Sequence, residues 1–251
     1  MDSRERVRRA LRFEHPDRAP RDLWRLPGIP MFRKAELEEV LALYPADITG
    51  PDFKYGPSTR AKGTPSVVGT YVDEWGSPFT VAEPGIIGEV KEPPLADWAA
   101  LAHFTPPFEL LNNADLSQVN RRCAETDRFV LAGTLVRPFE RMQFLRGSEN
   151  LYIDLAYRTA EMRRLREMIH DFEVQELEMW AKTDVDGISF MDDWGSQAAL
   201  LISPQMWREL FKPLYAEYCR IIHNAGKFVF FHSDGHITDI IPDLIKIGVD
   251  A

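Results

Sequence analysis

An imidazole and a carboxylate stand two residues apart near the end of the sequence. The run "KFVFFHSDGH" places His232, Asp234 and His236 directly after an apolar segment typical of a buried strand. Side chains at i and i+2 on an extended segment point to the same side, so His232 and Asp234 can reach one ion. Imidazole nitrogen and carboxylate oxygen are ordinary zinc ligands. The spacing predicts a zinc site at His232 and Asp234; the alternative is a buried histidine beside a helix-capping aspartate.

Two adjacent acids end the preceding apolar run, in "FMDDWG". Burying Asp192 and Asp193 beside the bulky Trp194 is costly unless a cation or a proton compensates. Strand alternation directs one acid inward and the other toward the covering helices. We interpret Asp192 and Asp193 as candidate catalytic residues. The alternative is a turn acid or an ion pair with a helix.

Further polar side chains follow two earlier predicted strands. Asp47 and Asp52 lie in "PADITGPDF", and Arg137 lies in "LVRPFERMQFLRG". Arginine can hold a carboxylate through two parallel hydrogen bonds. We therefore take Asp47, Asp52 and Arg137 as candidate substrate-binding residues. The alternatives are turn-forming aspartates and a solvated start of a helix.

The elements that must position these residues alternate regularly along the chain. A helix is expected over residues 3–13, and apolar or β-branched runs predict strands at 18–24, 45–50, 128–136, 185–193 and 227–233. Helical patterns separate most of these strands, which predicts a parallel sheet covered on both faces. Polar residues at the strand ends fit the mouth of a (β/α)8 TIM barrel, where active sites lie.

The chain is expected to form a single domain over residues 1–251. A final strand is expected to open at 249–251, which makes about six parallel strands, two βα units fewer than a closed barrel needs. We therefore expect a C-terminally truncated barrel; the alternative is a complete open α/β sheet. Residues from about 64 to 92 are expected to form an inserted antiparallel hairpin. No glycine-rich loop follows a strand, which argues against nucleotide binding.

Composition narrows the classes of partner. The formal net charge of −9 opposes binding to nucleic acid and to anionic membranes. No apolar run approaches the ~20 residues of a membrane span, and the charged N-terminus lacks the apolar core of a signal peptide. The two cysteines are far apart in the sequence. We expect a cytoplasmic protein with free thiols that binds neither nucleic acid nor membrane.

Several of these runs resemble the uroporphyrinogen decarboxylase superfamily. The resemblance rests on "VDGISFMDDWGSQ", "HSDGHITDIIPDL", "YVDEWGSPF" and "FERMQFLRG", and it implies a (β/α)8 barrel with its site in the mouth. In the decarboxylase branch, a Phe-Asp-Ser-Trp motif corresponds to Asp192 and Trp194, and an essential aspartate corresponds to Asp47 or Asp52. By this resemblance Trp194 is also a candidate substrate-binding residue. "RDLWRLPGIPMF" stands where the decarboxylases carry an arginine-rich substrate-binding segment.

The second branch of the superfamily consists of zinc-dependent methyltransferases. They move methyl groups between a corrinoid protein and a thiol or a methylated substrate, and they bind zinc through a His-x-Cys motif. His232 matches this histidine, whereas Asp234 stands where the cysteine would be. The combination "DDWG" with "HSDG" is closer to this branch. The resemblance therefore implies zinc, a corrinoid on a partner protein and a subunit that can form a homodimer.

Together these patterns predict a metal-dependent methyltransferase. Zinc at His232 and Asp234, assisted by an acid such as Asp193 or by residues beyond Ala251, would act as a Lewis acid in methyl transfer between a small methylated substrate or thiol and a corrinoid protein. One alternative is decarboxylation of a tetrapyrrole, in which an aspartate stabilises a pyrrole cation and arginines hold the carboxylates. Another is a barrel that binds a corrinoid or a porphyrin without chemistry.

Overall fold

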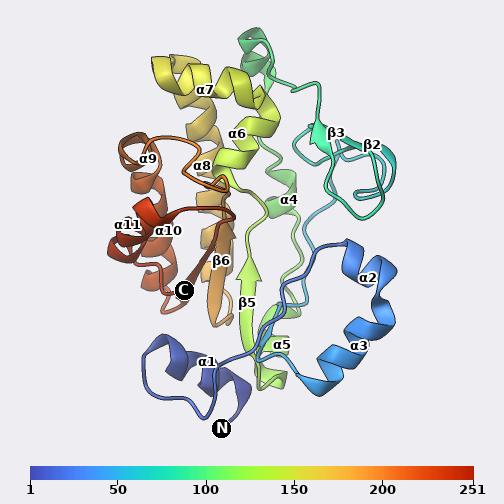
Figure 1. Ribbon diagram of the computed structural model, residues 1–251, viewed down its shortest axis with the longest axis vertical. Helices are drawn as coiled ribbons and strands as arrows, with labels where there is room; N and C mark the ends of the chain where they lie inside the picture. The colour runs from blue at the N-terminus through green and yellow to red at the C-terminus, as the bar shows by residue number, and fades with distance from the viewer.

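A four-stranded parallel sheet forms the centre of the computed structural model, which describes residues 1–251 (Figure 1). Its strands are β1 (Ile48–Thr49), β5 (Phe129–Gly133), β6 (Gly187–Met191) and β7 (Phe228–His232), in that order. Each neighbouring pair is parallel. The sequences of β5, β6 and β7 are almost wholly apolar because helices and loops cover the sheet. The predicted α/β fold with a parallel sheet is confirmed.

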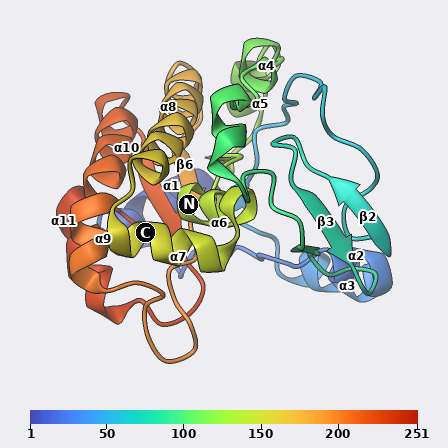
Figure 2. The same ribbon diagram turned by 90° about the horizontal axis from the view of Figure 1, so that it is seen from above.

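Helices make the crossovers between these strands. Between β5 and β6 lie α6 (Pro138–Arg146), α7 (Ser148–Tyr157) and α8 (Ala160–Ala181); between β6 and β7 lie α9 (Pro204–Leu210) and α10 (Lys212–Asn224). The turn η2 (Thr238–Ile240) and α11 (Ile241–Ile247) follow β7. Helices α8 and α10 pack against each other on one side of the sheet (Figure 2). Ser203 caps α9, accepting a hydrogen bond from the backbone N–H of Met206.

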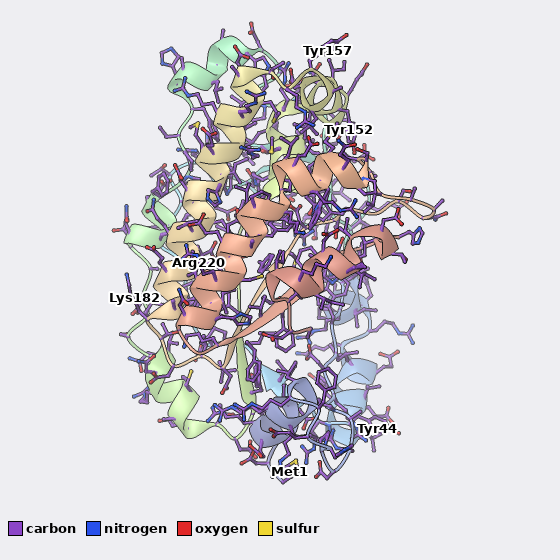
Figure 3. All side chains as sticks on the ribbon, turned by 90° about the vertical axis from the view of Figure 1, so that its left-hand side faces the viewer. Met1, Tyr44, Tyr152, Tyr157, Lys182 and Arg220 are labelled. Carbon is purple, nitrogen blue, oxygen red and sulfur yellow. The ribbon has the colours of Figure 1, made fainter.

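The remaining helices belong to the first half of the chain. They are α1 (Ser3–Leu11), α2 (Gly28–Phe32), α3 (Lys34–Leu43), η1 (Trp98–His103), α4 (Glu109–Asn112) and α5 (Val119–Glu125). In Figure 3, Met1 and Tyr44 lie at one end of the molecule and Tyr157 at the other. The β5 arrow in Figure 1 points away from α1 and toward α6, so the carboxyl ends of the strands face α6. No helix combines the length and the apolar character that crossing a bilayer requires.

A small antiparallel sheet stands beside α6. Strands β2 (Gly69–Val72), β3 (Pro78–Val81) and β4 (Glu89–Val90) pair in sequence order. This sheet occupies the region where a hairpin is expected and has one strand more. Asp73 holds the β2–β3 turn by accepting backbone hydrogen bonds from Trp75 and Ser77, and it pairs with Arg141 of α6. The ion pair fixes the small sheet against the carboxyl end of the parallel sheet.

The parallel sheet does not close into a barrel in this structure. The strand expected at 18–24 is wrong, because those residues form no ladder; the backbone N–H of Asp47 donates to the carbonyl of Arg21 at 2.7 Å. At the other edge, the N–H of Phe231 donates to the carbonyl of Ala251 at 2.8 Å. The N–H of Asp250 donates to the carbonyl of Val229 at 3.0 Å. The segment expected to open a strand therefore lies beside β7.

Arginines of the N-terminal segment close the amino end of the sheet. Arg6 and Arg18 each place a guanidinium nitrogen 2.6 Å from a carboxylate oxygen of Asp47, which is fully buried. Arg4 and Arg8 bind the buried carboxylate of Asp186 at 3.1 and 2.6 Å. Burial alone would raise the pKa of Asp47, but its hydrogen bonds outweigh burial and hold that pKa well below its usual range.

Two buried glutamates of α8 lie under the opposite end of the sheet. Glu176 accepts hydrogen bonds from the N–H of Leu135, at 2.9 Å, and from the hydroxyl of Tyr55. These bonds attach the loops that follow β1 and β5 to α8. Glu173, one turn earlier, is fully buried, and neither of its carboxylate oxygens has a hydrogen-bond partner. Burial raises the pKa of Glu176 to about 7 and the pKa of Glu173 well above its usual range.

We predict that Asp47→Asn lowers the free energy of unfolding by about 3 kcal/mol, because it leaves the buried guanidinium of Arg6 with one fewer opposing charge. The matched control is Asp52→Asn, since the Asp52 side chain is 73% exposed; that change should cost less than about 0.5 kcal/mol. Urea unfolding at pH 7 measures both. Equal effects of the two substitutions would contradict the structural role given to Asp47.

The buried carboxylate of Glu176 should make the stability of the protein depend on pH. Between its ordinary pKa of 4.5 and about 7, Glu176 keeps its proton in the folded protein and loses it in the unfolded chain. The unfolded state then binds fewer protons, so this residue makes stability fall as pH rises, by up to about 3 kcal/mol at about 1.4 kcal/mol per pKa unit. Glu176→Gln should flatten the decline measured by urea unfolding from pH 4.5 to 7.5. The exposed Glu178→Gln on the same helix should leave it unchanged; equal slopes in all three proteins would refute the assignment.

Candidate functional site

Three side chains that can bind metal meet at the carboxyl ends of β6 and β7. Asp193, His232 and Asp234 each offer one donor atom, and these atoms lie within 4.8 Å of one another. Nε2 of His232 is 3.3 Å from Oδ1 of Asp234 and 3.9 Å from Oδ1 of Asp193. Asp193 and His232 are half-buried, and Asp234 is exposed. A small ligand can therefore reach the cluster from the side of Asp234, whereas Asp193 and His232 are partly covered by the protein.

Two glycines allow the loops that carry these residues to touch. A methyl group on Gly195 would stand 2.4 Å from the backbone nitrogen of His236, and one on Gly235 would stand 2.2 Å from the carbonyl oxygen of Gly195. Gly235 also has a φ of +79°, which favours glycine. The loop after β6 and the loop after β7 thus pack backbone against backbone. This contact brings Asp193 next to His232 and Asp234.

Hydrogen bonds between the two loops fix the orientation of the carboxylates. The N–H of Asp234 donates to Oδ1 of Asp193 at 2.8 Å. The N–H of Trp194 donates to the hydroxyl oxygen of Ser233 at 3.0 Å, and the N–H of Gly195 donates to the carbonyl of Asp234 at 3.2 Å. The parallel pairing of β6 and β7 therefore continues into the loops. The side chain of Asp193 is held before any ligand binds.

Asp192 points to the opposite side of the sheet from Asp193, as the alternation predicts. Its carboxylate accepts the N–H groups of Phe139, at 2.6 Å, and Glu140, at 3.0 Å, in the first turn of α6. The hydroxyl of Tyr215 on α10 also donates to it. Asp192 is fully buried; burial raises its pKa to about 7, although these hydrogen bonds act in the other direction. Asp192 joins β6, α6 and α10 and does not reach the mouth.

Trp194 belongs to the core behind the cluster. It is fully buried, and its ring stacks on Phe139 with centroids 4.2 Å apart. Its indole N–H donates to the hydroxyl of Tyr215 at 3.1 Å. In this structure both side chains face the helices. A role for Trp194 in substrate binding and for Asp192 in catalysis stays a prediction.

The two other candidate aspartates also lie away from the cluster. Asp47 precedes β1 instead of following it, so it lies at the amino end of the sheet, where Arg6 and Arg18 occupy its oxygens. Asp52 is exposed and lies 3.4 Å from Arg122. The expected position of Asp47 after a strand is wrong, whereas a substrate-binding role for Asp47 or Asp52 stays a prediction. His236, the further imidazole, has its Nδ1 2.9 Å from the carbonyl of Ala198.

Arg137 does reach the mouth, where it stands between two acids. Its Nη1 lies 2.7 Å from Oε2 of Glu140 and 3.6 Å from Oδ2 of Asp193. Burial raises the pKa of Glu140, and the neighbouring Arg137 offsets part of that rise. For Arg137, burial lowers the pKa, but the charge and hydrogen bond of Glu140 together with the charges of Asp193 and Asp192 outweigh burial, so the net shift of the pKa is upward. The guanidinium is thus held as a fixed cation beside the cluster of Asp193, His232 and Asp234.

Two cavities adjoin this ion pair, and both are lined by Glu140 and Phe144. One, of about 350 Å³, lies between the small sheet and α6; the residues around it include Tyr71, Phe79, Leu135, Arg137 and Arg141. The other, of about 440 Å³, includes Asp193 in its wall. A ligand in either cavity would contact Phe144 and other apolar side chains as well as charged ones, among them Glu140.

Trp24 is a site residue that the sequence did not reveal. Its ring stacks on the imidazole of His232, with centroids 5.1 Å apart and an interplanar angle of 29°. Trp24 is 58% exposed, so it covers His232 from the solvent side. The sequence contained one indication of this role. Trp24 is the last residue of the segment 18–24, which was expected to be a strand, and the carboxyl ends of barrel strands meet where active sites lie.

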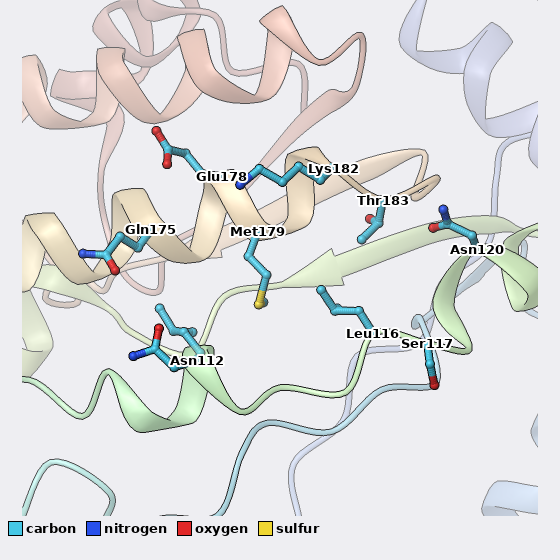
Figure 4. A pocket seen from close by; sticks show the side chains of 10 residues that line it. Asn112, Leu116, Ser117, Asn120, Gln175, Glu178, Met179, Lys182 and Thr183 are labelled. Carbon is cyan, nitrogen blue, oxygen red and sulfur yellow. The ribbon is translucent and has the colours of Figure 1, made fainter.

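A further cavity lies far from this chemistry. It has a volume of about 450 Å³ and lies between α8 and the segment that leads into α5 (Figure 4). Its wall includes Gln175, Glu178 and Met179 of α8 and Lys182 directly after that helix, with Asn120 opposite. The cluster of Asp193, His232 and Asp234 is not part of its wall. We therefore place the candidate site at the carboxyl ends of β6 and β7.

The chain is similar to proteins of known family and fold. The family model described as uroporphyrinogen decarboxylase (URO-D) matches residues 65–251. A solved structure of a methyltransferase from Methanosarcina mazei superposes with a TM-score of 0.69 at 14% identity, covering 100% of this chain and 75% of that chain. At this identity the likeness establishes the fold alone. No curated protein matches the sequence significantly. Because the family model spans most of the chain, the protein belongs to the uroporphyrinogen decarboxylase (URO-D) family.

Proposed function

We propose that this protein is a metal-dependent methyltransferase of the URO-D family. It would move a methyl group between a small methylated substrate or a thiol and a corrinoid carried by a partner protein. The observation that supports this most is the convergence of Asp193, His232 and Asp234 at the carboxyl ends of β6 and β7. The name of the Methanosarcina mazei protein and the resemblance of the "DDWG" and "HSDG" runs to the methyltransferase branch point in the same direction.

The donor set fits zinc. One imidazole nitrogen and two carboxylate oxygens are ligands that zinc accepts at ~2.0–2.2 Å, and three protein ligands with one open position are typical of catalytic zinc. Cys123 and Cys219 are buried, free and outside the cluster. The set therefore lacks thiolate, and it would make the metal less electron-rich than a site with cysteine ligands.

We further propose that the parallel sheet is part of a (β/α)8 barrel. Its two edges are not bare, because Asp47 hydrogen-bonds to Arg21 at one edge and Phe231 to Ala251 at the other. The family match and the superposition with the methyltransferase structure support the same architecture. In such a barrel the cluster and both cavities beside Glu140 lie where active sites occur.

The surrounding residues suggest how a substrate is held. When bound, the metal supplies Lewis acidity toward the thiol of an acceptor or the leaving atom of a methyl donor. The methyl group departs without the bonding electrons, so the leaving atom gains negative charge that must be stabilised. Tyr71, Phe79 and Phe144 offer an apolar wall for the body of the substrate and exclude water from it. Trp24 limits the movement of the His232 ring.

The corrinoid partner and the cellular location are inferences of the same proposal. The corrinoid follows from the resemblance to the methyltransferase branch, whose members take or give the methyl group at a protein-bound corrinoid. Both cysteines are free thiols, which favours a reducing compartment, and we place the protein in the cytoplasm.

The metal content tests this proposal. After incubation with zinc and desalting, elemental analysis should find one equivalent of zinc in the unmodified protein. His232→Ala, Asp234→Ala and Asp193→Ala should each lose most of it, because two remaining ligands hold zinc weakly. His236→Ala is the matched control and should keep one equivalent, since its Nδ1 faces the carbonyl of Ala198. Zinc content that is unchanged in the three variants, or no zinc in any protein, would refute the proposal.

A further inference from the structure

The ion pair of Arg137 and Glu140 bears directly on the metal-binding cluster. The guanidinium of Arg137 lies 2.7 Å from Oε2 of Glu140 and 3.6 Å from Oδ2 of Asp193, so it is shared unequally between the two acids. The three side chains are 31%, 18% and 24% exposed in the order Arg137, Glu140 and Asp193. At this burial, solvent only partly screens the interactions among their charges.

Asp193 has one carboxylate oxygen on each side. Oδ1 accepts the N–H of Asp234 and faces the imidazole of His232, whereas Oδ2 faces Arg137. A cation held by Asp193, His232 and Asp234 would therefore bind a carboxylate that Arg137 already neutralises in part. Two positive charges would then lie on either side of one carboxylate, and their repulsion opposes binding of the metal.

Glu140 is fixed where it can draw Arg137 away from Asp193. It lies in the first turn of α6, and its N–H donates to the buried Asp192 at 3.0 Å. Its carboxylate makes the shorter of the two contacts with the guanidinium. If Glu140 were neutral, Asp193 would be the nearer anionic partner of Arg137. The negative charge of Glu140 thus decides how much of Asp193 is available to a metal.

We propose that Arg137 and Glu140 set the metal affinity of the cluster. Arg137 is a built-in positive charge that competes with the metal for Asp193, and Glu140 is a positioning residue that reduces this competition. The inference rests on the proposed function, because it takes Asp193 as a metal ligand. In this inference Glu140 acts on the metal only through Arg137. An experiment can therefore distinguish this role from direct attraction between the negative charge of Glu140 and the metal.

The test is the dissociation constant of zinc, measured at pH 7.5 by competition with a chromophoric chelator. Arg137→Gln should bind zinc about tenfold more tightly, because a half-buried repulsion between two cations is removed. Glu140→Gln should bind it about tenfold more weakly, because Arg137 then pairs with Asp193. Arg137→Lys keeps the charge and should stay within about threefold of the unmodified protein.

The double variant Arg137→Gln/Glu140→Gln shows whether Glu140 acts through Arg137. If it does, Glu140→Gln should change the dissociation constant less than about threefold in the Arg137→Gln background. Arg220→Gln is the charge-matched control, because this residue is exposed on α10, and it should leave the constant unchanged. Circular dichroism and a thermal melt confirm that each variant is folded.

Several results would overturn the inference. An Arg137→Gln protein that binds zinc no more tightly than the unmodified protein contradicts the competing role of Arg137. Equal weakening by Glu140→Gln in both backgrounds contradicts the positioning role of Glu140. In both cases the unmodified protein still binds zinc, so the proposed function stands. An unmodified protein that binds no zinc at all overturns the proposed function and this inference together.

Discussion

The candidate site depends on one close contact between two backbones. Gly195 and Gly235 approach so nearly that a single methyl group on either would overlap the other loop. This approach and the pairing of β6 with β7 together place Asp193, at the end of β6, beside His232 and Asp234, at the end of β7. The backbone hydrogen bonds that continue from the strands into the loops depend on the same approach. The cluster of Asp193, His232 and Asp234 therefore requires glycine, which has no side chain, at positions 195 and 235.

The adjacent aspartates show how one strand end can serve both stability and function. Strand alternation turns Asp192 toward the helices, where it is fully buried and holds the first turn of α6 and the hydroxyl of Tyr215. The same alternation turns Asp193 toward the mouth. Because Asp192 also binds the N–H of Glu140, the buried acid positions the residue that holds Arg137 beside the cluster. The buried contacts of Asp192 with the helices therefore influence where the charge of Arg137 lies beside the cluster.

Local patterns predicted the parallel sheet, the pairing of His232 with Asp234 and the opposite directions of two neighbouring acids, because these follow from period and spacing alone. The misplacement of Asp47 has a physical cause: only Ile48 and Thr49 pair with β5, so the preceding aspartate falls at the amino end of the sheet. Glu140 pairs with Arg137 at i,i+3, a spacing that the sequence shows directly. The stacking of Trp24 on His232 joins segments distant in the sequence, so only the place of Trp24 at the end of the segment 18–24 pointed toward it.

The most direct measurement is X-ray absorption spectroscopy of the protein loaded with one equivalent of zinc. It reports the elements bound to the metal and does not require a known substrate. Zinc bound by Asp193, His232 and Asp234 should show a first shell of nitrogen and oxygen at about 2.0–2.1 Å, with the outer-shell pattern of one imidazole and no sulfur. A sulfur neighbour at about 2.3 Å, or a spectrum without imidazole, would contradict a site built from Asp193, His232 and Asp234.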